Sequence, residues 1–150
     1  MNRVYRIAVA STRDGVLYPG HFAHAEVYHI YELSDEGKLT LLEVRENPLG
    51  LVPDVDIEEH GHTHHHHTVR SPEGLPLHGP PKYMWLRENV LKDVDVVIAV
   101  DACQTSYRVF TSQGVRIIFT DPVPVESLVN YIENEGREEF KKIIEEYFRE

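Results

Sequence analysis

Val94-Asp95-Val96-Val97-Ile98-Ala99-Val100 decides the fold of this chain. The run is almost continuous in apolar side chains, which is typical of a strand buried on both faces of a parallel sheet. Helical patterns lie on both sides of it, over residues 83–91 and over residues 103–113, and the second pattern ends at Gly114. A buried strand between two helices predicts an α/β arrangement with parallel pairing in this half of the chain.

The remaining segments predict a mixed sheet with helices packed on it. Residues 115–119 form a second buried-strand pattern. Two amphipathic helices follow, one opened by Pro124 and one over residues 136–150. Before the central run, apolar segments separated by turn residues predict a three-stranded meander over residues 3–11, 27–33 and 39–45. We therefore predict an α/β fold with a sheet of about five strands, antiparallel in the meander and parallel afterwards.

The chain length and one long insert define the expected domain organisation. The 150 residues fit one domain with a substantial core, so residues 1–150 are predicted to form a single domain. Residues 49–81 carry no clear period and are rich in histidine and proline. A loop of this length inside a compact domain is usually functional or disordered, so we expect an insert there.

Charge and composition exclude several classes of protein. The formal net charge is −10, and lysine and arginine are scattered, which argues against a nucleic-acid partner. We see no signal-peptide pattern and no apolar stretch of membrane-spanning length, so we expect a soluble, cytoplasmic protein without a membrane partner. The single cysteine, Cys103, excludes an internal disulfide and a site built from four cysteines of one chain.

Residues 60–67 read His-Gly-His-Thr-His-His-His-His, so six of eight side chains are imidazoles. Neutral imidazole is the commonest protein ligand for borderline metals, which predicts metal capture by this run. The alternative is that a tract recognised by composition alone binds several metals loosely and none specifically. The candidate metal ligands here are His60, His62, His64, His65, His66 and His67.

Several landmarks together resemble the dinitrogenase iron–molybdenum cofactor biosynthesis family. The opening strand, a His-Phe-x-x-Ala segment, an Asn-Pro tripeptide, a histidine-rich insert and the central strand occur in the family's order. They are Arg6-Ile7-Ala8-Val9-Ala10, His21-Phe22-Ala23-His24-Ala25, Glu46-Asn47-Pro48, residues 60–67 and residues 94–99. The resemblance covers roughly residues 3–133. It implies a ribonuclease-H-like three-layer architecture and a role in binding, carrying or inserting metal–sulfur cofactors.

The chain departs from the family pattern at two positions. Where the family usually has a glycine-rich turn after the central strand, this chain has Asp101-Ala102-Cys103-Gln104. Ala23 stands where the family's His-Phe segment commonly has glycine. Side chains would therefore meet a cofactor that approached the main chain closely at this turn.

Cys103, His21 and His24 are the candidate cofactor ligands. Cys103 follows the buried strand and begins a helix, a position that favours both ligand binding and a thiolate. Because Cys103 shares a helical face with Tyr107 and Phe110, it could instead be a core residue. His21 and His24 could share a metal with Cys103 if their loops meet at one edge of the sheet. Alternatively, His21 bonds loop backbone and His24 faces solvent, while His29, on a strand face, is expected to be packed.

These patterns favour a non-catalytic carrier of a metal ion or metal–sulfur cluster, which could serve a client metalloprotein. Thiolate and imidazole suit iron, molybdenum–sulfur species, zinc, nickel and copper without choosing among them. One alternative is a zinc, nickel or copper buffer that uses only the histidine run. Another is a Mg²⁺-dependent nuclease with Asp14 and Asp101 at strand ends, which the acidic charge disfavours. The sequence does not predict an oligomeric state.

Overall fold

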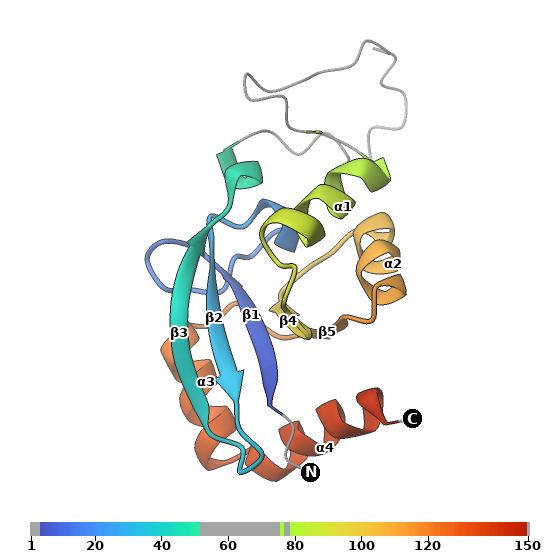
Figure 1. Cartoon of the computed structure of the whole chain (residues 1–150). Helices are drawn as coiled ribbons and strands as arrows, with labels where there is room; N and C mark the ends of the chain where they lie inside the picture. Colours follow the sequence, from blue (N-terminus) through green and yellow to red (C-terminus); the bar gives the residue numbers. More distant parts are fainter. Residues whose placement is uncertain (1–3, 52–75, 77–78, 150) are drawn as a thin grey trace.

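The structure is a computed structural model that describes residues 4–51, 76 and 79–149. Its sheet has the strand order β3-β2-β1-β4-β5. β1 pairs with β2 and β2 with β3 in antiparallel fashion, whereas β1, β4 and β5 run parallel. The strands are β1 (Tyr5–Ser11), β2 (Val27–Leu33), β3 (Leu39–Glu46), β4 (Val96–Ala99) and β5 (Arg116–Phe119) (Figure 1). The predicted mixed five-stranded sheet is confirmed.

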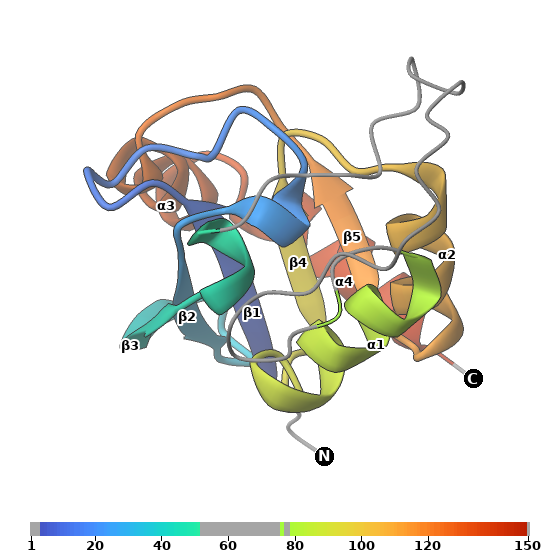
Figure 2. The same cartoon turned by 90° about the horizontal axis from the view of Figure 1, so that it is seen from above.

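Helices cover both faces of the sheet, which makes three layers (Figure 2). The helices α1 (Gly79–Asn89) and α2 (Gln104–Ser112) contribute to the core cluster that contains Tyr28 and Ile30 of β2. The helices α3 (Val125–Asn134) and α4 (Arg137–Phe148) pack on the opposite side, against alternate residues of the same strands. The central strands β1 and β4, which have helices on both sides, are therefore buried on both faces. None of the helices that the structure describes is long and apolar enough to cross a membrane.

The predicted elements agree with the structure, with one shifted helix and two additions. The helix predicted over residues 83–91 is α1, which begins at Gly79 and ends at Asn89, because Pro80 and Pro81, assigned to the insert, are tolerated in the first turn of a helix. The predicted strand over residues 27–33 matches β2, and Gly114 ends the α2 segment with a φ of 85°, a left-handed conformation that favours glycine. Two short 3₁₀ helices were not predicted, η1 (Phe22–His24) and η2 (Pro48–Leu51), because elements of three or four residues carry no readable period. The histidine run at 60–67 and His78 lie outside the described residues. The ribonuclease-H-like label stays a prediction.

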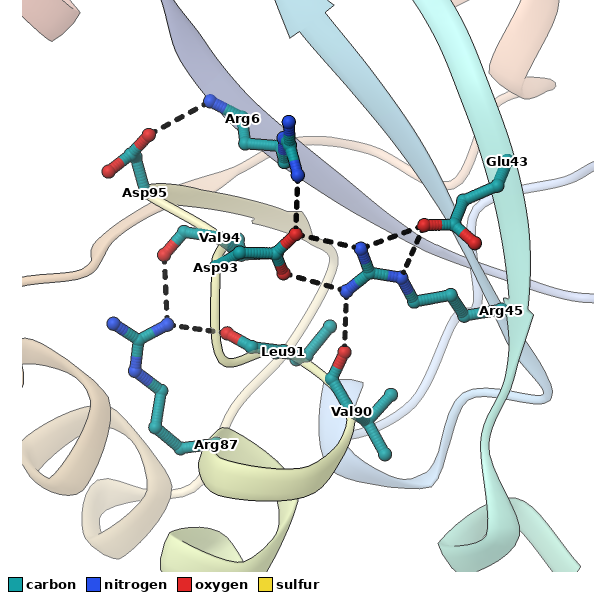
Figure 3. Close-up of polar contacts among 9 residues, drawn as sticks. All are labelled: Arg6, Glu43, Arg45, Arg87, Val90, Leu91, Asp93, Val94 and Asp95. Atoms are coloured by element: carbon teal, nitrogen blue, oxygen red, sulfur yellow. Dashed lines mark hydrogen bonds and ion pairs between the residues drawn. The ribbon is translucent and has the colours of Figure 1, made fainter.

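An ion-pair network fastens the N-terminal end of β4 to the antiparallel half of the sheet (Figure 3). The Arg45 guanidinium of β3 uses all of its N–H groups: it donates to Glu43, to both carboxylate oxygens of Asp93 and to the carbonyl of Val90. Arg6 of β1 donates to the same Asp93 carboxylate, with N and O 2.6 Å apart. Hydrogen bonds from Arg45 hold the pKa of Asp93 well below its usual range, against the opposing effect of its partial burial.

Candidate functional site

The C-terminal end of β4 meets the loop that carries His21. A parallel bridge joins His21 to Asp101, and the Phe22 N–H donates to the Asp101 carbonyl at 3.0 Å. Cys103 follows two residues later. The condition that these two loops meet at one edge of the sheet is therefore fulfilled, and this is the edge where ligands bind in open α/β sheets.

Asn47 holds the His21–His24 segment in place. Its buried side chain donates from Nδ2 to the carbonyls of Ala23 (2.9 Å) and Ala25 (2.7 Å), and its Oδ1 accepts from the Leu49 N–H (3.1 Å). Gly50 completes this contact, because a Cβ there would lie 2.5 Å from the Ala25 carbonyl oxygen. The Asn-Pro tripeptide therefore joins η2 to η1 and orients both histidines.

Cys103 is the N-cap of α2 and is half-buried. Its Sγ accepts the Ser106 N–H at 3.3 Å, which satisfies one of the free donors in the first turn of the helix. The Tyr83 hydroxyl of α1 lies 3.3 Å from the same sulfur. The buried positions of α2 are Ser106 and Phe110, whereas Tyr107 is exposed. Cys103 therefore lies at the boundary between the core and the site.

The surroundings of Cys103 favour the thiolate. Burial raises the pKa of the thiol, but hydrogen bonds from His21, Ser106 and Tyr83 lower it by more, and the result is a pKa of about 6. An ordinary cysteine thiol has a pKa of about 8.5, so most molecules would carry the anion at neutral pH. The thiolate is the form of cysteine that binds metals.

His21 lies flat against Tyr83, with ring centroids 5.5 Å apart and an interplanar angle of 8°. Its Nδ1 accepts the Ala23 N–H at 3.2 Å, so the neutral ring carries its proton on Nε2. That Nε2 faces the Tyr83 hydroxyl at 3.4 Å and is a donor toward Cys103. The bond between His21 and loop backbone, which was the alternative to a ligand role, is present, and the same ring also reaches the thiol.

His24 is buried, so the alternative that it faces solvent is wrong. Its Nδ1 lies 3.1 Å from the Leu49 carbonyl, which only accepts, and Nδ1 therefore carries the proton. The lone pair on Nε2 accepts from Lys82 Nζ at 3.0 Å. Lys82 has an exposed fraction of 0% and also lies 4.8 Å from the centroid of the Tyr83 ring.

Of the three predicted cofactor ligands, the structure brings Cys103 and His21 together, while His24 packs edge-on against His21 and engages Lys82. Within residues 4–51, 76 and 79–149, no three His, Cys, Asp or Glu side chains group as a metal site. Asp14 and Asp101 are both exposed and belong to no such group in that part of the chain. The two-metal arrangement that a nuclease would need is therefore not found among these residues.

Sequence reasoning missed three residues of this cluster: Lys82, Tyr83 and Asn47. The first two lie on a helix face that reads as ordinary core, and nothing in the spacing of one lysine or one tyrosine reveals a polar role. The tripeptide with Asn47 was noticed, but its bonds join segments far apart in sequence. His29 is packed as expected, with Nδ1 2.9 Å from the Ser11 hydroxyl and a pKa lowered by burial.

The chain is similar to two solved structures at low sequence identity. The crystal structure of PH0822 has 12% identity and a TM-score of 0.54, and the match covers 85% of this chain and 88% of that chain. The NMR structure of a putative NifB protein from Thermotoga, TM1290, described as a DUF35 family protein, has 21% identity and a TM-score of 0.51, covering 87% and 89%. These likenesses concern the fold alone. No curated protein matches the chain.

A family model extends over most of the chain. The model described as dinitrogenase iron-molybdenum cofactor matches residues 3–135, which run from the start of the sheet through α3 and include Asn47, His21 and Cys103. The family links the chain to the biosynthesis or handling of that metal cluster. This chain belongs to the dinitrogenase iron–molybdenum cofactor family.

Proposed function

We propose that this protein is a non-catalytic carrier of a metal ion or metal–sulfur cluster, which it binds through Cys103 and His21 and delivers to a client metalloprotein. One observation carries the proposal: a thiol at the C-terminal end of β4 receives hydrogen bonds from an imidazole, a phenol and a helix N–H, and its pKa is about 6. Thiolate and imidazole are ligands for iron, copper and zinc and for metal–sulfur fragments.

The hydrogen bonds of the cluster give the two ligands different roles. Cys103 is already largely deprotonated at neutral pH, so its sulfur can bind cargo without losing a proton. His21 must move its proton from Nε2 to Nδ1 before Nε2 can bind a metal, and this breaks the bond from the Ala23 N–H. Cys103 is therefore the primary ligand and His21 the second. Metal binding by His21 is the weaker of the two because it costs about one hydrogen bond, the one from the Ala23 N–H.

The family favours a metal–sulfur species as the cargo, because the cofactor that it is named for is a metal cluster. Lys82 contributes to the surroundings of the two ligands. Its side chain is fully buried beside His24 and against the ring of Tyr83, whose hydroxyl contacts the thiol.

The test is metal and acid-labile sulfide content, with an absorption spectrum, on tag-free protein purified and reconstituted without oxygen. We expect iron or molybdenum with sulfide in the wild type, loss of cluster in Cys103→Ala and weaker retention in His21→Gln. His29→Gln is the matched control, because that imidazole bonds Ser11 and lies outside the site. A wild type that takes up no metal or sulfide on reconstitution would refute the proposal.

Deleting residues 60–67 separates the carrier from the alternative of a zinc, nickel or copper buffer based on the histidine run. The carrier keeps a site that is sensitive to Cys103→Ala after the deletion. A buffer loses nearly all of its metal and is indifferent to Cys103. If the wild type holds zinc or nickel without sulfide, and the deletion removes all of this metal, the protein is a buffer and our proposal is wrong.

A further inference from the structure

The two end strands of the sheet differ in how they protect their unpaired edges. β3 and β5 are the outermost strands in the described sheet. The pairing of β3 with β2 contains a register shift, and β3 carries charged side chains at Glu43, Arg45 and Glu46. Bulges and charges of this kind prevent pairing with another chain. β5 pairs with β4 without a shift, and its last three residues, Ile117-Ile118-Phe119, are uncharged.

The backbone of β5 has the right alternation to pair with a second copy of itself. Arg116 N donates to Asp95 O and Thr120 N donates to Ala99 O, so the even-numbered residues direct their backbone groups toward β4. Ile117 and Phe119 direct theirs toward the unpaired edge. In an antiparallel pairing centred on Ile118, Ile117 lies opposite Phe119 of the partner subunit, and Phe119 lies opposite Ile117 of the partner subunit. Both are then hydrogen-bonded pairs.

The side chains match in the same register. On the α2 face, Phe119 is 50% exposed and stacks on Tyr107, which is 39% exposed, with ring centroids 6.2 Å apart. The register places Phe119 opposite Ile117 of the partner subunit and continues an apolar face across the junction. On the other face, Ile118 lies opposite Ile118 of the partner subunit.

Tyr147 limits the length of the free edge at the N-terminal end of β5. Arg116 lies over the Tyr147 ring. The register brings Arg116 opposite Thr120 of the partner subunit. The Tyr147 hydroxyl donates to the Val115 carbonyl at 3.2 Å. This carbonyl, just before β5, is therefore already bonded and is not used in the new pairing. The new ladder therefore spans residues 117–119.

We propose that the free edge of β5 joins two copies of this chain in an antiparallel pairing about a two-fold axis at Ile118. β5 lies at the end of the sheet in Figure 2, and such a junction would make one continuous sheet of two subunits. Because the two β5 strands run in opposite directions, the two Cys103 sites lie at opposite ends of the joined sheet. This inference is independent of the cargo.

Sedimentation of the full chain from low to several hundred micromolar, without added metal, tests the pairing. We expect a monomer–dimer equilibrium in the wild type. Phe119→Pro removes an N–H that points away from β4, so it leaves the β4 pairing intact and weakens the dimer about tenfold or more. Leu42→Lys, on the exposed face of β3, is the matched control and is expected to leave the dimer unchanged.

A charge exchange provides a second test that does not depend on proline. Ile118→Lys and Ile118→Glu are each expected to weaken the dimer, because two like charges would then lie opposite each other at the two-fold axis, and an equimolar mixture of the two variants is expected to restore it. Circular dichroism checks that each variant is folded. If Phe119→Pro does not fold, the charge exchange alone tests the pairing through β5. A wild type that stays monomeric over the whole range would overturn the proposal. A dimer abolished by Leu42→Lys and kept in Phe119→Pro would place the junction at β3 instead.

Discussion

The two ends of β4 carry polar clusters of opposite character. At the N-terminal end, the two guanidinium groups of Arg45 and Arg6 are balanced by two carboxylates, those of Asp93 and Glu43, and the Val90 carbonyl also accepts from Arg45, so that every N–H group of Arg45 is used (Figure 3). At the C-terminal end, Cys103 and His21 are joined by hydrogen bonds, and the fully buried Lys82 lies nearby.

The difference teaches how to tell a structural cluster from a candidate site in this fold. The N-terminal cluster is complete, because its donors and carboxylates are matched and a ligand would only displace them. The C-terminal cluster is organised around a half-buried thiolate that donors stabilise but do not neutralise. A group held in its reactive form at the ligand-binding edge of a sheet indicates a functional site, whereas a closed ion-pair network indicates a structural role.

The largest effect is expected from Asn47→Ala, which tests whether neutral hydrogen bonds hold the C-terminal end together. The variant leaves the buried carbonyls of Ala23 and Ala25 without their donor and the Leu49 N–H without its acceptor. We expect the free energy of unfolding to fall by about 3 kcal/mol, measured by urea denaturation. The loss should be the same at pH 7 and pH 4, because no charged group is involved. A loss below about 1 kcal/mol would contradict this role.

The next effect concerns the ion pairs at the N-terminal end. Asp93→Asn removes the carboxylate shared by Arg45 and Arg6, and we expect a loss of about 2 kcal/mol at pH 7, moderated by the partial exposure of these side chains. The pKa of Asp93 is lowered in the folded state, so its contribution is complete above the unfolded pKa of about 4 and disappears as the pH falls through the folded value. The difference between wild type and variant should therefore shrink progressively below pH 4.

Glu43→Gln is the matched control for that experiment. Glu43 contacts the same guanidinium, but its side chain is more exposed than that of Asp93, so its removal should cost clearly less. If both variants cost the same, or if the Asp93→Asn loss persists unchanged in acid, the N-terminal end is not held by its charges.

A smaller effect is expected at the thiol itself. The rate of iodoacetamide alkylation follows the thiolate and should rise with pH to a midpoint near 6, the pKa of Cys103. Tyr83→Phe removes the hydroxyl 3.3 Å from the sulfur and should raise this midpoint by less than about one pH unit. Tyr107→Phe on the same helix as Cys103 is the control and should not move it. A wild-type midpoint above 8 would refute the proposed thiolate.

The contrast between the two ends also separates what the sequence could predict from what it could not. Periodicity located the strands and helices from β1 to α4 to within a few residues, and the position of Cys103 after the buried strand placed it at the ligand-binding edge, whereas the approach of the His21 loop to that edge was only a condition. Both inferences rest on patterns within single segments. The contacts of Lys82 with His24 and of Asn47 with Ala23 and Ala25 depend on three-dimensional approach between separate segments, which no local pattern encodes. The closed charge network around Arg45 was missed for the same reason.

The smallest effect is a pH-dependent change in stability for Cys103→Ser. Serine is itself a good N-cap, so the variant should keep α2 and differ little from wild type at pH 6. The thiol pKa of about 6 lies below the unfolded value of about 8.5, so the thiolate stabilises the wild type fully above the unfolded value, and this gain is lost as the pH falls through 6. We expect the wild type to gain less than about 1 kcal/mol over the variant between pH 6 and pH 9, because the half-buried sulfur is partly screened by water. Urea midpoints at the two pH values measure it. A difference independent of pH would mean that folding does not perturb the thiol, and the two ends of β4 would then differ only in composition.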